Sequence, residues 1–155
     1  MKLTTFVALL ILSFQCLADD LSSKVQSIES EWASIYYKLP KNKQEAAYDI
    51  LLAKNQHLAE QFPNSAELLF WQALVLASNA ELQDGYTALK AIHKARDLLQ
   101  AALKIDPQTA NGSAYVTLGT LYYMVPSWPI AFGDKNIAEQ MFQSALKINP
   151  NGIDT

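Results

Sequence analysis

The chain has 155 residues, enough for one compact domain or a short array of repeats. Half of the residues are hydrophobic, 17% are charged and only 5 are glycine, which excludes a disordered chain and favours a packed, helix-rich one. The formal net charge of -3 is too small to indicate nucleic acid or an anionic membrane surface as a partner.

Residues 1–18 have the pattern of a cleavable signal peptide. A positive start is followed by a short apolar run, and small residues at Cys16 and Ala18 predict cleavage between Ala18 and Asp19, with delivery to the periplasm. The run is too short for a stable membrane span. Two large residues precede Cys16 where a lipoprotein signal has small ones, so we expect no lipid anchor. Cleavage would remove the only cysteine, which suits an oxidising compartment.

Six helices are expected from apolar residues at three- and four-residue spacing. Ser22 or Ser23, Asn42 and Asp134 are the expected N-caps of the first, second and sixth helices. The predicted ranges are 19–39, 43–62, 66–82, 86–105, 113–124 and 134–148. Since no alternating strand pattern of useful length occurs, the sequence predicts an all-α chain of short antiparallel helix hairpins.

The sequence also repeats itself. Segments Ala95–Pro107 and Ala138–Pro150 share the pattern Ala-x-x-x-Leu/Phe-x-x-Ala-Leu-x-x-Asp/Asn-Pro. Small residues allow two helices to cross closely, and proline ends the second helix. The pattern resembles the tetratricopeptide repeat (TPR), which implies hairpins stacked as a short TPR-like α-solenoid. The matching positions are Leu118, Gly119, Tyr122, Gly133, Asp134, Ala138, Phe142, Ala145, Leu146 and Pro150 in the last repeat, and Ala73, Leu76, Ala95, Leu99, Ala102, Leu103 and Pro107 in the middle one.

This resemblance divides the chain after residue 18 into three units. Residues 19–63 form a degenerate repeat or a capping hairpin, 64–109 a repeat with an extended hairpin, and 110–155 a repeat with an inserted loop. An ordinary helix bundle whose helices end in proline is the alternative. Because no capping helix follows the last repeat, we expect either a truncated repeat in a fragment or a homo-oligomer that covers its apolar face.

The insert Met124–Phe132 interrupts the last repeat. It places Gly119 and Ala138 seven residues farther apart than the TPR pattern does. The insert is apolar and carries Trp128 between two prolines at a hairpin tip. It is therefore either a hydrophobic plug or a loop that contacts a ligand.

The insert and its flanks are similar to a narrower family. Gly-x-x-Tyr at Gly119, Val-Pro-x-x-Pro-Ile-x-Phe-Gly-Asp from Val125 and Ala-Leu-x-Ile-x-Pro-Asn-Gly from Ala145 resemble the T-components of TRAP (tripartite ATP-independent periplasmic) transporters. The resemblance is good over Gly112–Asp154 and loose elsewhere. It implies an exported helical-repeat protein that works with a periplasmic solute-binding protein.

The binding surface expected from TPR geometry is the concave groove lined by the first helix of each repeat. Its positions carry no lysine or arginine, so a clamp for a peptide carboxylate is not expected. An apolar groove suits a hydrophobic peptide segment or an apolar small molecule. Alternatively, Trp32 and Tyr36 of the N-terminal helix fill this groove as core. The candidate ligand- or partner-binding residues are Phe70, Trp71, Leu74, Val116, Thr120, Tyr123, Met124, Trp128 and Phe132.

Catalytic and metal-binding patterns are not found in the sequence. His57 with Glu60, and His93 with Asp97, have the spacing of ordinary surface pairs on a helix. Phosphate loops, nucleophile elbows and zinc-protease motifs are missing, so we expect no enzyme, no cofactor and no metal.

The predicted function is an exported TPR-like scaffold for protein–protein interaction. A carrier of an apolar small molecule and an envelope assembly adaptor are the alternatives.

Overall fold

Proline, glycine and aspartate residues divide the chain into helices at the predicted places. The computed structural model describes residues 2–152, with side chains from Asp20 onward, so the signal-peptide prediction concerns side chains outside the described part. The elements are α1 (Lys2–Lys38), α2 (Lys41–Gln61), α3 (Ala66–Ala80), α4 (Gly85–Ile105), a 3-10 turn η1 (Thr109–Gly112), α5 (Ser113–Met124) and α6 (Lys135–Ile148). Across residues 2–152 the only β-type pairing is an isolated bridge between Ser127 and Gly133, which confirms the all-α prediction.

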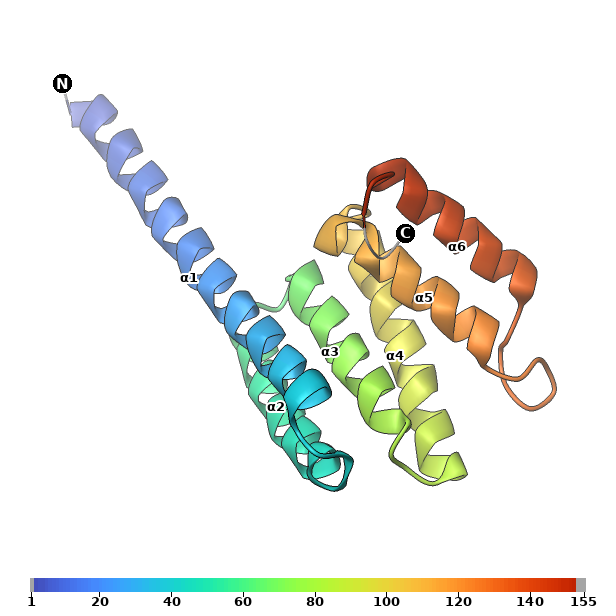
Figure 1. The fold of residues 1–155 in the computed structure, drawn as a ribbon. Coiled ribbons are helices and arrows are strands. Elements are labelled where there is room, and N and C mark those ends of the chain that lie inside the picture. The colour runs from blue at the N-terminus through green and yellow to red at the C-terminus, as the bar shows by residue number, and fades with distance from the viewer. Residues whose placement is uncertain (1, 153–155) are drawn as a thin grey trace.

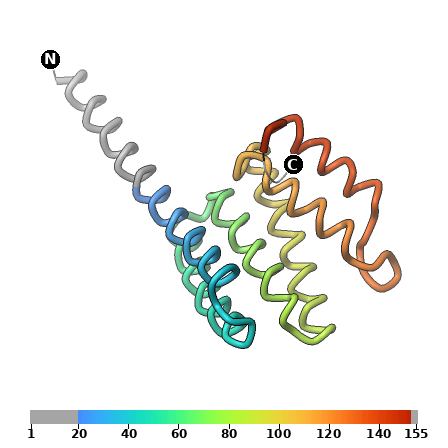
Figure 2. The backbone as a smooth tube through the Cα atoms, viewed as in Figure 1, coloured from blue at the N-terminus to red at the C-terminus, as the bar shows by residue number. Residues whose placement is uncertain are grey.

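Consecutive helices pair as antiparallel hairpins that lie side by side in a row. Figure 1 shows α1 with α2, α3 with α4 and α5 with α6, and the tube in Figure 2 follows the same path. Contacts of α2 with α3 and of α4 with α5 join one hairpin to the next, and α1 also packs on α3. The result is a helical repeat-like stack. Over the part of the chain with described side chains, none of the helices has the length and hydropathy that crossing a membrane requires.

Small residues lie where the paired helices approach most closely. Ala73 of α3 and Ala95 of α4 are fully buried in the second hairpin. At Gly119 of α5, an added Cβ would lie 2.8 Å from the ring of Phe142 of α6. These positions are the small residues of the repeat pattern, and their size sets the helix separation.

Side-chain capping explains three of the helix starts. The Asp134 carboxylate accepts hydrogen bonds from the backbone N–H groups of Asn136 (2.8 Å) and Ile137 (3.1 Å), which confirms the predicted cap of α6. Asp84 caps α4 and Ser65 caps α3 in the same way.

Two predicted caps are wrong. Asn42 lies inside α2, which begins at Lys41 after Pro40, where the proline φ of -57° already suits a helix start. Ser22 and Ser23 lie inside α1, and the Ser23 hydroxyl donates to the Asp20 carbonyl at 2.9 Å. A hydroxyl bonded to the preceding turn is compatible with a helix interior, so these serines do not start a helix.

The extra residues of the last two repeats have different structures. Those of the middle repeat lengthen α3 and α4, which leave only a short turn between Ala80 and Gly85. Those of the last repeat form a closed loop, in which the Gly133 N–H donates to the Pro126 carbonyl and the Asp134 N–H donates to the Tyr122 carbonyl, both at 2.9 Å.

A candidate apolar groove

A groove of about 720 Å³ lies between α1, the α3–α4 hairpin, α5 and the insert. Most of its lining is aliphatic or aromatic. The lining residues are Trp32, Tyr36, Tyr37, Leu74, Ala77, Ser78, Ala80, Glu81, Gly85, Ala88, Leu89, Ile92, Val116, Thr117, Thr120, Leu121, Met124, Val125, Pro126 and Ile130. The groove lies on part of the concave face predicted from the repeat, and three separate hairpins contribute to its lining.

Three aromatic rings of α1 form one wall. The rings of Trp32 and Tyr36 are stacked with centroids 5.3 Å apart, and the ring of Tyr37 meets that of Tyr36 edge-on at 4.9 Å. The Trp32 indole N–H donates to the Ser78 hydroxyl at 2.9 Å, which ties α1 to α3. Trp32 also packs on Trp71, with ring centroids 5.9 Å apart, so the α1 rings cover that part of the predicted concave face as core and line the groove that remains.

The α5 side of the groove offers little free hydrogen-bonding capacity. The Thr120 hydroxyl donates to the Val116 carbonyl, and the Thr117 hydroxyl donates to the Ser113 carbonyl, each at 2.9 Å. Because both hydroxyl protons are used within the helix, this side favours contact with apolar groups.

Only one charged side chain, Glu81, lines the groove. It follows the last turn of α3 as its C-cap residue. Lysine, arginine and histidine do not line it, as the repeat register predicts. Within the described residues Glu81 makes no salt bridge, so no ion pair neutralises its carboxylate.

The structure brings together four of the nine candidate residues. Leu74, Val116, Thr120 and Met124 line the groove. They come from α3 and α5, the first helices of the second and third hairpins.

Three other candidates are packed elsewhere. Phe70 and Trp71 are only 3% and 9% exposed. The ring of Trp71 packs against Trp32 of α1, with centroids 5.9 Å apart, and the ring of Phe70 packs against Trp71 at 5.2 Å. Phe132 turns toward α4, where the Arg96 guanidinium lies 4.5 Å from its ring centroid. Its ring also meets those of Tyr122 and His93 edge-on, at 5.3 Å and 5.0 Å. The packing of Phe132 fits the first of the two alternatives for the insert, a hydrophobic plug.

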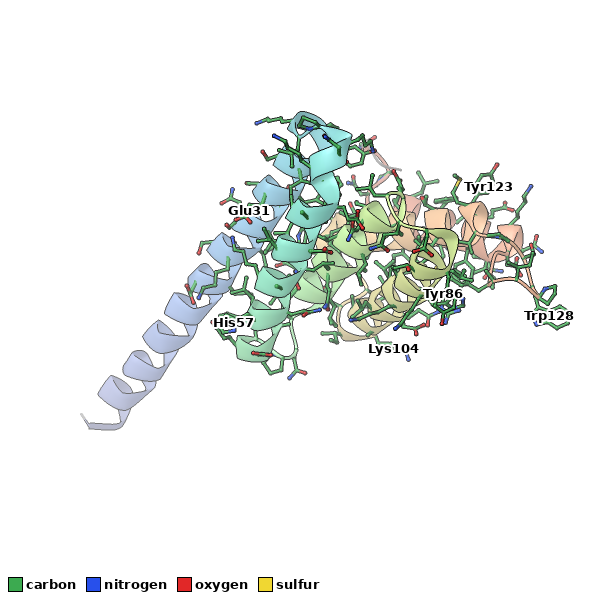
Figure 3. The ribbon with its side chains drawn as sticks, turned by 90° about the horizontal axis from the view of Figure 1, so that it is seen from below. Glu31, His57, Tyr86, Lys104, Tyr123 and Trp128 are labelled. Carbon is green, nitrogen blue, oxygen red and sulfur yellow. The ribbon has the colours of Figure 1, made fainter. Side chains whose placement is uncertain are left out.

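The last two candidates, Tyr123 and Trp128, are exposed and do not line the groove. Trp128 is 86% exposed and stands at the outer end of the insert in Figure 3. Tyr123 is 56% exposed, with the Lys135 ammonium 5.6 Å from its ring centroid. The insert therefore combines a packed residue with an exposed apolar tip.

Residues that the repeat register did not identify complete the groove. Tyr37 and Glu81 are the most informative, since they supply a phenol and the only charge. The register covers the first helices of the last two repeats, whereas these residues belong to α1 and to the end of α3. In the sequence, the close spacing of Trp32, Tyr36 and Tyr37 was the feature that could have indicated an aromatic wall on the first helix.

The histidines do not form a site. His57 lies 3.6 Å from Glu60 and both are exposed, as predicted. The predicted pair of His93 and Asp97 is wrong, because the Asp97 carboxylate binds Arg96 at 2.8 Å instead. Among the residues with described side chains, no group of three or more His, Cys, Asp or Glu residues could hold a metal ion.

Comparison with known proteins adds no relative: no family model matches the chain, and no curated protein is detectably similar to it in sequence.

Proposed function

We propose that the chain is a TPR-like scaffold, exported to the periplasm, that binds an apolar group in its groove and catalyses no reaction. The observation that carries this proposal is the groove itself, about 720 Å³ with aromatic and aliphatic walls and one ionic side chain. Concave apolar sites with few polar groups are typical of ligand and peptide binding.

A protein partner is supported by the exposed apolar tip, which we define as Tyr123, Met124, Trp128 and Ile130. Their side chains are all exposed, although they are large and hydrophobic. Such clusters mark interaction surfaces, and tryptophan and tyrosine are enriched at the centres of protein interfaces. The resemblance to T-components makes a solute-binding protein of a TRAP-type transport system the proposed partner.

A second role, as carrier of a small apolar molecule, is favoured by the volume of the groove. Sites for small molecules have volumes of roughly 300–1,000 Å³, and the groove has about 720 Å³. The groove and the apolar tip share Met124 and Ile130, whereas Trp128 and Tyr123 of the tip do not line the groove, so a partner that docks on these two residues alone leaves the groove open.

An affinity pull-down from periplasmic extract tests the protein partner. Trp128→Ala should weaken capture without lowering the melting temperature, since an 86% exposed side chain contributes little to folding. Tyr86→Ala is the matched control, because Tyr86 is 82% exposed on α4 and should capture the partner normally. Equal capture by both variants would contradict docking at the tip.

Native mass spectrometry tests the carrier role. Thr120→Trp places a large side chain in the groove, whereas Gln143→Trp adds one to an exposed position of α6. A bound small molecule should be present on the wild type and on Gln143→Trp, and lost from Thr120→Trp. A molecule retained by Thr120→Trp would place the binding site elsewhere.

A further inference from the structure

We propose that the groove takes a small apolar molecule with one ammonium group, which sits against the rings of Trp32, Tyr36 and Tyr37 with Glu81 as its counter-charge. This inference rests on the carrier role and specifies the chemistry of its ligand.

The charge of the groove points to a cation. Glu81 is the only ionised side chain of its lining, and no salt bridge within the described residues neutralises it. It follows the end of α3, where the helix already presents the negative end of its dipole and its last carbonyls. A carboxylate is disfavoured at that end of a helix, so its position raises the negative potential at this part of the groove.

The aromatic rings lie at the same end as the carboxylate. Trp32 is hydrogen-bonded to Ser78, which precedes Glu81 by three residues and therefore lies on the same side of α3. Tyr36 stacks on Trp32, and Tyr37 meets both rings nearly perpendicularly, at interplanar angles of 80° and 81°. Rings set at right angles beside a carboxylate form the type of surface that binds organic ammonium groups through cation–π attraction.

The nearest buried hydroxyl adds no charge to this part of the groove. Tyr48, buried behind the wall, has a raised pKa because burial disfavours its ionised form, so its hydroxyl stays neutral at pH 7. The Ser78 hydroxyl donates its proton to the Leu74 carbonyl at 2.9 Å and makes no hydrogen bond with the Tyr48 hydroxyl.

One cation of the chain already approaches the wall. The Lys41 ammonium lies 5.9 Å from the centroid of the Tyr36 ring, although Lys41 does not line the groove. The ring is therefore accessible to a cation, and Lys41 opposes a second one through like-charge repulsion.

Three probes with the same apolar body test the proposal: 4-phenylbutylamine, 4-phenylbutanol and 4-phenylbutanoate. Binding to the purified chain is measured at pH 7 by NMR titration. The amine should bind about tenfold more tightly than the alcohol, from cation–π attraction and a partly exposed ion pair, and the carboxylate should bind most weakly. Glu81→Gln should remove most of the preference for the amine and leave the alcohol unchanged. Glu67→Gln, an exposed change on the same helix outside the groove, should leave the preference intact.

The outcomes separate this inference from the carrier role. Equal binding of amine and alcohol, or an amine preference that survives Glu81→Gln, overturns the inference while the alcohol still reports an apolar site. If no probe binds, or if Thr120→Trp binds the alcohol as well as the wild type does, the carrier role fails and the inference fails with it. Lys41→Ala should tighten amine binding, and an unchanged affinity would overturn the placement of the ammonium on Tyr36.

Discussion

Gly133→Ala is expected to destabilise the chain through the insert. The added Cβ would lie 1.9 Å from the Val125 carbonyl oxygen, whereas an ordinary contact is 3.4–4 Å. The loop must therefore open by roughly 1.5 Å, since the obstacle is backbone and cannot rotate away. This movement strains two hydrogen bonds, from Gly133 to Pro126 and from Asp134 to Tyr122.

The expected loss of folding free energy is about 1–2 kcal/mol. Each strained hydrogen bond contributes about 0.5–1.5 kcal/mol, and alanine returns about 0.4–1 kcal/mol by restricting the unfolded chain. For a chain of this size the loss corresponds to a decrease in Tm of roughly 3–8 °C, measured by circular dichroism at 222 nm. Gly85→Ala is the matched control, because nothing lies within 4 Å of its added Cβ. If the two variants melt within a degree of each other, the described packing of the insert is wrong.

Three further changes test the hairpins. Gly119→Ala should destabilise the wild type more than it destabilises a Phe142→Leu background, with a coupling of about 0.5–2 kcal/mol in urea unfolding, since the added Cβ meets the Phe142 ring at 2.8 Å. Gln44→Met should cost about 1–3 kcal/mol by the same assay, because this buried amide donates to three carbonyls near the end of α1, whereas Gln56→Met at an exposed position should cost little. Asp84→Ala should lower Tm at pH 7, because hydrogen bonds from the Thr87 hydroxyl and from backbone N–H groups favour the ionised Asp84 and lower its pKa. The stabilisation by the ionised carboxylate is complete above about pH 4 and is lost as pH falls through the lowered pKa. The Tm values of the wild type and of Asp84→Ala should therefore converge at low pH.

The helices could be predicted closely because their ends depend on local chemistry. Proline, glycine and an aspartate cap act through the adjacent backbone, so Asp134 was identified from its position alone. Asn42 was wrongly assigned as an N-cap because both Pro40 and Asn42 can start a helix, and α2 begins after Pro40.

The binding surface was harder to predict because α3 is apolar on several sides. A register count places Phe70, Trp71 and Leu74 on the concave face, but the first two are buried, Trp71 against Trp32 of α1, and only Leu74 lines the groove. Which side is covered depends on how the first hairpin packs, and that hairpin has little of the repeat pattern. Tyr37 of α1 was missed for the same reason, whereas Glu81 was missed because it follows the last turn of α3, beyond the register positions.

Binding of the neutral dye Nile red to three variants tests the groove most directly. The wild type and Gln143→Trp should bind one dye molecule with equal affinity, with a rise in dye fluorescence. Thr120→Trp, which fills the groove at a lining position, should weaken binding at least about tenfold. Unchanged dye affinity in a folded Thr120→Trp variant would contradict the assignment of the groove as the binding site.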